Sequence, residues 1–150
     1  MPCPIRLTYI LMVHKNPAQV RRLIERLNCA DAGFVLHVDG NQYIAPFQKE
    51  LAQLPKDVRL AWNPNRIKAG WGSFASCQTD LSNLRYALAV APDSDYIIRL
   101  SGQDYPLWPA DRIPAFFRQF EGNPSIQCVP FGRADQWPGW VGWRTDRYYY

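Results

Sequence analysis

Short apolar segments alternate with amphipathic segments along this chain, and this alternation constrains its fold more than any other feature. The apolar segments predict strands, and apolar residues at helical spacing predict helices between them. The strands are expected at 7–14, 34–38, 58–62, 96–100 and 126–129, and the helices at 17–27, 44–54, 73–91 and 111–120. Strands that alternate with helices are typical of a mostly parallel sheet with helices on both faces. The sequence therefore predicts an α/β fold.

Three of the expected helices carry more detailed predictions. Asn16 stands where it would cap the first helix, with Pro17 at the first helical position. Ser73 or Ser76 is expected to cap the third helix, and Asp111 the fourth. The third helix also carries an apolar stripe, which predicts its buried face. The stripe consists of Phe74, Cys77, Leu81, Leu84 and Leu88.

The composition excludes several classes of protein. The chain has 150 residues, of which 47% are hydrophobic and 20% charged, close to the average of a globular domain. No apolar run approaches the roughly 18–20 residues of a membrane span. The net charge of +4 comes from scattered basic residues, which fits a phosphate-bearing small ligand or no specific ligand rather than nucleic acid. The four cysteines form no Cys-x-x-Cys motif, so reduced thiols are expected.

The carboxyl ends of the expected strands are where a ligand should bind, as in other parallel α/β sheets. This rule selects His14, Asp39 and the segments 63–72 and 101–106. The Asp39 carboxylate could accept hydrogen bonds from ribose hydroxyls or a base edge. It could equally cap a turn, because Gly40 and Asn41 follow it. The sequence leaves both interpretations open.

Several nucleotide and metal sites are excluded or disfavoured. The loop after the first strand, HKNPAQ, has no glycine, and no Gly-rich P-loop occurs. A dinucleotide dehydrogenase is therefore disfavoured, and P-loop phosphoryl transfer is excluded. His14 and His37 could bind a metal together with Asp39, but a third strong ligand is missing. We expect the two histidines to have structural or ligand-contact roles instead.

The segment SGQDYPL, at 101–107, follows the fourth expected strand. A metal-dependent sugar-nucleotide transferase would carry two carboxylates one residue apart here, to hold Mg²⁺ or Mn²⁺. In this chain only Asp104 is acidic, and its neighbour is Gln103. The pair predicts a hydrogen-bonding platform for sugar hydroxyls rather than a metal site. A plain tight turn is the alternative, since Gly102 and Pro106 both favour one.

Four stretches in order resemble one known family. They are YILMVHK at 9–15, FVLHVD at 34–39, AGWGSF at 69–74 and LSGQDYPL at 100–107, and TDRYY at 145–149 also fits. The chain is similar to the core-2/I-branching β-1,6-N-acetylglucosaminyltransferase and peptide O-xylosyltransferase family, the Branch enzymes of glycosyltransferase family 14. The resemblance spans nearly the whole chain.

The resemblance implies a GT-A-type fold and an inverting, metal-independent transfer without a cofactor. GlcNAc or xylose would pass from a UDP-sugar donor to a hydroxyl of a glycan or protein acceptor. Uracil would lie between Val13 and His14, and Asp39 would bind the uridine. Carried over by position, the substrate-binding residues are Val13, His14, Asp39, Arg66, Trp71, Gly72, Ser101, Gln103 and Asp104.

The resemblance also implies that part of the enzyme is missing from this chain. The family's catalytic glutamate and its pair of basic residues lie downstream, so the base is expected beyond Tyr150. Glu121, Asp135 and Asp146 are weak substitutes, and we take none of them as the base. The prediction is a nucleotide-sugar-binding subdomain at 1–129 and the start of an acceptor-binding part at 130–150. The residues Trp137, Trp140 and Trp143 would form an acceptor-sugar platform or pack against the remainder.

Two other functions remain open at this point. One is a catalytically inactive carbohydrate-binding fragment, and the other is a Mg-dependent α/β nucleotidyltransferase. The sparse cysteines and the lack of an anchor favour a bacterial cytoplasmic enzyme. A Golgi lumenal domain is the alternative, with membrane attachment only through an anchor outside this chain.

Overall fold

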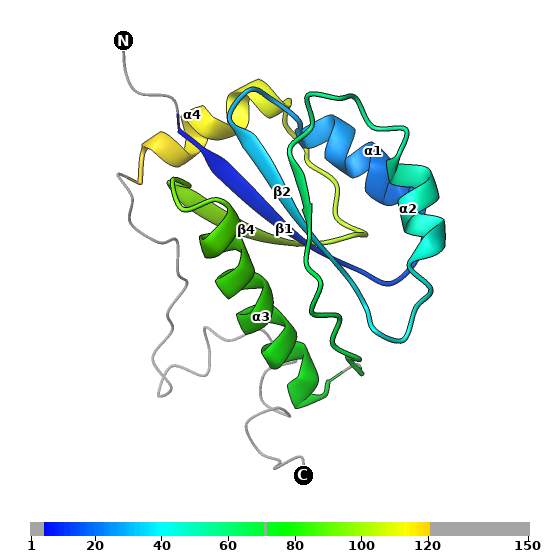
Figure 1. Cartoon of the computed structure of the whole chain (residues 1–150). Helices are drawn as coiled ribbons and strands as arrows, with labels where there is room; N and C mark the ends of the chain where they lie inside the picture. The colour runs from blue at the N-terminus through cyan, green and yellow to red at the C-terminus, as the bar shows by residue number, and fades with distance from the viewer. Residues whose placement is uncertain (1–4, 71, 121–150) are drawn as a thin grey trace, which may run out of the picture.

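The computed structural model describes residues 5–70 and 72–120, which form a four-stranded sheet with helices on both faces (Figure 1). The elements are β1 (Leu7–Val13), α1 (Pro17–Leu27), β2 (Ala32–Val38), α2 (Ala45–Leu51), β3 (Leu60–Trp62), α3 (Phe74–Val90), β4 (Tyr96–Ser101), the short 3-10 helix η1 (Ala110–Arg112) and α4 (Ile113–Arg118). The predicted α/β class is confirmed, and the architecture is consistent with a GT-A-like glycosyltransferase fold.

Some predictions fall outside the described residues. They concern Cys3, Trp71, the expected strand 126–129, Cys128, the boundary at 129–130, the three acidic residues considered as bases (Glu121, Asp135 and Asp146) and the three tryptophans Trp137, Trp140 and Trp143.

The sheet order is β3-β2-β1-β4, and every pair of neighbouring strands is parallel. The chain builds outward from β1 to β2 and β3, and then crosses back to place β4 on the other side of β1. The direction of winding therefore changes between β1 and β4. In open α/β sheets, the crevice for a ligand lies at such a switch point, beyond the carboxyl ends of the strands.

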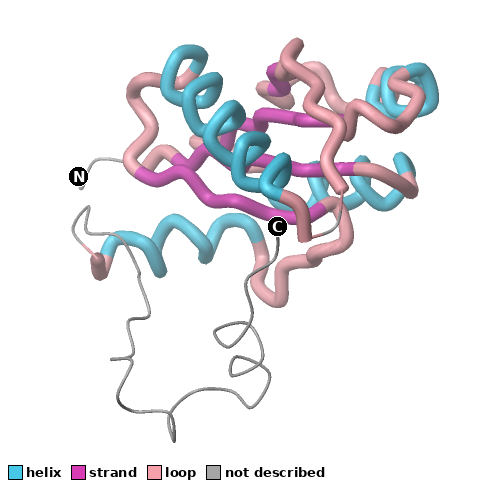
Figure 2. The backbone as a smooth tube through the Cα atoms, turned by 90° about the horizontal axis from the view of Figure 1, so that it is seen from below, coloured by secondary structure: helices cyan, strands magenta, loops and turns pink. Residues whose placement is uncertain are grey.

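The two faces of the sheet are buried to different extents. On one face, Tyr9 and Leu11 of β1 join a large core with α1 and α2. On the other face, Ile10 and Val35 form a small core with Ala87 of α3. Figures 1 and 2 show α3 on the opposite side of the strands from α1 and α2. Because β1 is covered on both faces, its sequence is a nearly continuous apolar run.

The predicted buried face of α3 is wrong. Phe74, Leu81 and Leu88 of the apolar stripe are 73%, 54% and 54% exposed. The residues that α3 buries against the sheet are Thr79, Asn83 and Ala87. Asn63 Nδ2 donates to Asn83 Oδ1 at 2.7 Å, and within the helix Thr79 Oγ1 donates to the Ala75 carbonyl at 2.8 Å. The buried Asn83 Nδ2 has no hydrogen-bond partner among the described residues. The side of α3 that faces the sheet is therefore small and polar, and it is joined to the end of β3 by the bond between Asn63 and Asn83.

The boundaries of the helices differ from the sequence prediction in smaller ways. Asn16 does precede α1, but it adopts a left-handed conformation (φ 52°), and its side chain makes no capping bond. Ser73 precedes α3, and its hydroxyl bonds to Gly70 instead of the helix. Asp111 lies inside η1, so it caps nothing. In the described part of the chain, no helix is both long and apolar enough to cross a membrane.

Candidate functional site

A cavity of about 360 Å³ opens at the carboxyl ends of β1, β2 and β4. It is lined by His14 after β1, Asp39 after β2 and Ser101 at the end of β4. The other lining residues are Met12, Asn41, Gln42, Ala69, Gly70, Ser76 and Arg99. The cavity thus lies at the switch point of the sheet, and it brings together three residues that the sequence had selected.

Asp39 caps a turn, which is one of the two roles that the sequence left open, and contact with a nucleotide stays a prediction. Its Oδ1 accepts a hydrogen bond from the Asn41 N–H at 2.7 Å, as in a capped turn. Its backbone N–H donates to the Val13 carbonyl at 2.9 Å, which ties the turn to β1. The second carboxylate oxygen accepts no hydrogen bond from any described residue. One oxygen therefore fixes the turn, while the other is available to a ligand in the cavity.

Gly40 lets the next loop pack directly against this turn. Its N–H donates to the Ile67 carbonyl at 2.9 Å. A Cβ at this position would lie 2.8 Å from the Arg66 carbonyl oxygen and 2.9 Å from the Lys68 nitrogen. Such contacts with backbone atoms leave room only for glycine. The close approach places Ala69 and Gly70 at the wall of the cavity.

Arg66, which was expected to line the nucleotide cleft, lies behind the turn instead. Its Nε donates to the Val38 carbonyl at 3.1 Å, and its Nη2 donates to the carbonyls of Asp39 (2.9 Å) and Gln42. It is not among the residues that line the cavity. These bonds hold the backbone around Asp39, so Arg66 positions the carboxylate.

His37 fixes the same loop from inside the sheet. It is 1% exposed, and its Nε2 accepts a hydrogen bond from the Ile67 N–H at 3.1 Å. Burial lowers the pKa of His37, and the Arg66 charge lowers it further, although Asp39 acts in the opposite direction. A neutral ring is the form that can accept the bond. Among the described residues, no group of three or more His, Cys, Asp or Glu side chains could hold a metal ion.

The turn after β4 is tied to its own backbone. Asp104 Oδ2 accepts the Ser101 N–H at 2.7 Å, and Ser101 Oγ accepts the Gln103 N–H at 3.2 Å. Gln103 and Asp104 are exposed and do not line the cavity. The segment therefore forms a tight turn, and Ser101 lines the cavity. Contact of Gln103 and Asp104 with a sugar stays a prediction.

Two further residues of the expected site lie beside or beneath the cavity. Val13 is 2% exposed and packs under Gly102, where a Cβ would lie 2.8 Å from Val13 Cγ1. Gly72 is exposed, with a φ of +73°, and does not line the cavity. Contact of these residues with a ligand stays a prediction.

The sequence argument missed Arg99, which lines the cavity from β4. Its Nε donates to Asp80 Oδ1 at 3.1 Å, and its Nη2 lies 3.4 Å from Met12 Sδ. The available signal was a single charged residue within the otherwise apolar strand segment YIIRL. Such a residue in a covered strand indicates a polar environment at one face.

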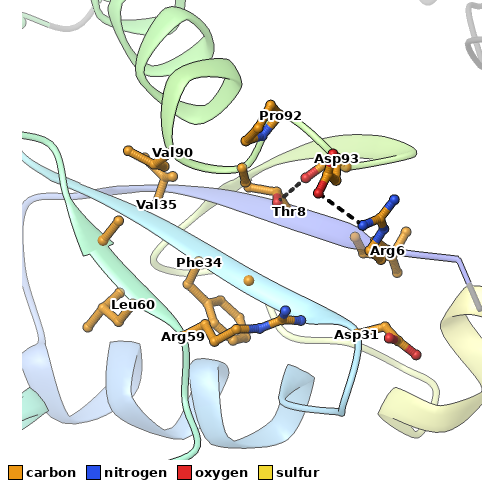
Figure 3. A pocket seen from close by; sticks show the side chains of 15 residues that line it. Arg6, Thr8, Asp31, Phe34, Val35, Arg59, Leu60, Val90, Pro92 and Asp93 are labelled. Atoms are coloured by element: carbon orange, nitrogen blue, oxygen red, sulfur yellow. Dashed lines mark hydrogen bonds and ion pairs between the residues drawn. The ribbon is translucent and has the colours of Figure 1, made fainter.

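A second cavity, of about 390 Å³, opens at the opposite, amino edge of the sheet (Figure 3). Several of its polar side chains are paired with one another or with backbone. The Arg6 guanidinium lies 3.2 Å from the Asp93 carboxylate (Figure 3), and the Thr8 and Ser94 hydroxyl oxygens lie 2.6 Å apart. Arg59 donates to the carbonyls of Ala30 and Ala32. The carboxyl-edge cavity is the better candidate for a ligand site, because it lies at the switch point of the sheet.

Most of the chain is similar to proteins of one known family. The family model described as "Core-2/I-Branching enzyme" matches residues 7–138. A xylosyltransferase of Ciona intestinalis is 28% identical over 136 residues, which cover 89% of this chain. The xylosyltransferase sqv-6 of Caenorhabditis elegans is 24% identical over 71% of the chain, and the xylosyltransferase oxt of Drosophila pseudoobscura pseudoobscura is 26% identical over 82%.

The matched region is a small part of these relatives. It spans 15%, 13% and 14% of their respective lengths. All three are animal proteins, so the expected bacterial origin finds no support in them.

Proposed function

Because the chain belongs to the Core-2/I-branching enzyme family, we propose that it forms the donor-binding part of a glycosyltransferase. The donor is a UDP-sugar, and the acceptor is a hydroxyl of a glycan or protein. The three relatives compared above are named xylosyltransferases, which favours xylose over GlcNAc as the transferred sugar.

The observation that carries this proposal is the cavity at the switch point of the sheet. It is lined by His14, Asp39 and Ser101, each from a different one of the stretches that resemble the family. The available oxygen of Asp39 suits a ribose hydroxyl, because a carboxylate only accepts hydrogen bonds. His14 is exposed beside it and offers a ring edge to the uracil.

In the proposed reaction, the acceptor oxygen forms a bond to C1 of the sugar on the face opposite the leaving group. The bond between C1 and the diphosphate oxygen breaks, and the diphosphate leaves with the bonding electrons. The acceptor proton passes to a base. None of the described residues is assigned as that base. The contribution of this chain is to bind and orient the donor, which lowers the barrier by positioning.

We further propose that the transfer needs no metal ion. The segment 101–107 has one carboxylate, Asp104, where a metal-dependent enzyme of this kind would carry two. Asp104 uses Oδ2 to accept the Ser101 N–H. Positive charge on the leaving diphosphate must then come from side chains.

Titration calorimetry with UDP tests the proposal. We expect the 150-residue chain to bind UDP equally well with and without EDTA. Asp39→Asn should weaken binding by about 1–3 kcal/mol, because it replaces a hydrogen-bonding carboxylate in the cavity. Asp111→Asn, an equal change of charge at an exposed position of η1, is the matched control and should bind as the unaltered chain does. Loss of binding in EDTA would contradict metal independence, and absence of UDP binding by a folded sample would refute the proposed function.

A further inference from the structure

Among the described residues that line the carboxyl-edge cavity, Arg99 is the only lysine or arginine. It lies on β4 two residues before Ser101, so both side chains leave the same face of the strand. This is the face that α3 covers, since Arg99 pairs in register with Ile10 of the small core.

The hydrogen-bonding capacity of Arg99 is largely unused. A guanidinium has five N–H donors. Here Nε donates to Asp80 Oδ1, and Nη2 approaches only the thioether of Met12, which is a weak acceptor. No described residue accepts a hydrogen bond from Nη1. The ion pair with Asp80 is itself weak, because the two side chains are 56% and 44% exposed.

The cavity is therefore polarised. Asp39 follows β2 and Arg99 lies on β4, with β1 between these two strands. Both groups line the cavity, so its two sides carry opposite charges. Near the basic side, Ser101 Oγ accepts the Gln103 N–H, and no described residue accepts the Ser101 hydroxyl proton. That side can donate several hydrogen bonds, while the Asp39 side can accept them.

We propose that Arg99, together with the Ser101 hydroxyl, binds a phosphoryl group of the ligand. This inference rests on the proposed function and deepens it, because it fixes the direction in which the nucleotide lies. The ribose hydroxyls are at Asp39, and the phosphates are at Arg99. Asp80 is a positioning residue that holds Nε and directs the remaining donors of the guanidinium.

The difference between the affinities of the chain for UDP and for uridine measures the contribution of the phosphoryl contact. The unaltered chain should bind UDP at least about tenfold more tightly than uridine, as expected for charge-assisted hydrogen bonds to one guanidinium. Arg99→Gln should abolish this preference and leave the affinity for uridine within about twofold. Arg99→Lys should retain part of the preference, because a lysine keeps the charge but not the planar fork.

Arg85→Gln is the matched control. It removes the same charge from an exposed position on α3 that does not line the cavity, so the preference for UDP should be unchanged. Circular dichroism of each variant confirms folding, and uridine binding confirms that the nucleoside end of the cavity is intact.

The outcomes separate the two proposals. If the unaltered chain binds both ligands equally, or if Arg99→Gln keeps the preference for UDP, the phosphoryl contact is refuted while nucleotide binding stands. An equal loss in Arg85→Gln would also refute it, because the effect would then be one of net charge. If neither UDP nor uridine binds, the proposed function fails together with this inference.

Discussion

His37 shows how one buried side chain can support a site that it does not line. Its ring nitrogen accepts the Ile67 N–H, and Ile67 in turn accepts the Gly40 N–H next to Asp39. Two successive hydrogen bonds thus connect the imidazole to the loop at Ile67, and that loop to the turn at Asp39. Protonation of Nε2 would replace the acceptor by a donor, and the bond to Ile67 would be lost.

A pH dependence of stability follows from this arrangement. The folded-state pKa of His37 is lowered below 6.5, chiefly by burial, so near that pH the unfolded chain binds more protons than the folded one. The free energy of unfolding should therefore decrease as the pH falls below about 6.5 towards the folded-state pKa. Urea denaturation at several pH values between 7.5 and 5.5 measures this decrease in the free energy of unfolding.

The variant His37→Gln should lose this part of the pH dependence. His14→Gln is the matched control, because His14 is exposed and the change leaves His37 in place, so it should keep the slope of the unaltered chain. An unchanged slope in His37→Gln would show that His37 does not titrate on unfolding.

The elements differ in how far the sequence could predict them. In α1, the four residues at helical spacing, Val20, Leu23, Ile24 and Leu27, are all buried, so the spacing correctly predicted the buried side of this helix. For α3 the spacing predicted the helix but not its orientation. The decisive contact joins Asn63 to Asn83, and a pair 20 residues apart cannot be found from helical periodicity. In the site, His14, Asp39 and Ser101 could be predicted from the sequence because each lies at or just after the end of a strand. The positions of strand ends depend only on the topology of the sheet.

Other parts of the site depend on side-chain placement in three dimensions. Nothing in the local sequence around Arg66 indicates that its guanidinium binds three backbone carbonyls. Arg99 reaches the cavity only because the register pairs Met12 with Ser101, which places β4 at the same height as β1. Register and side-chain conformation therefore limit what the sequence alone can predict here.

The orientation of α3 predicts how two substitutions on this helix change the stability of the chain. Leu88→Gln should change the free energy of unfolding by less than about 0.5 kcal/mol, because the side chain is exposed. Ala87→Leu, at the neighbouring position, should destabilise the chain by about 1–3 kcal/mol, because a larger side chain must enter the fully buried contact with Ile10 and Val35. Chemical denaturation of both variants measures the difference. The reverse order would mean that the apolar stripe, and not Ala87, faces the sheet.

At the scale of the whole molecule, the described residues form a doubly wound sheet organised around β1. The sheet has one cavity at the amino ends of its strands and one at their carboxyl ends. Only the second lies at the switch point between β1 and β4, where α/β sheets bind their ligands. In the first cavity, Arg6 forms an ion pair with Asp93 (Figure 3). The central claim is that the donor nucleotide binds at the carboxyl edge.

Hydrogen exchange with and without saturating UDP, read by mass spectrometry, tests this claim most directly. The account predicts slower exchange of the amides at 39–42, 66–70 and 101–104, where the backbone borders the cavity, and unchanged exchange at 6–8, 31–35 and 90–94 at the amino edge. Slower exchange confined to the amino-edge segments, or no change at the carboxyl edge in a folded sample, would contradict it.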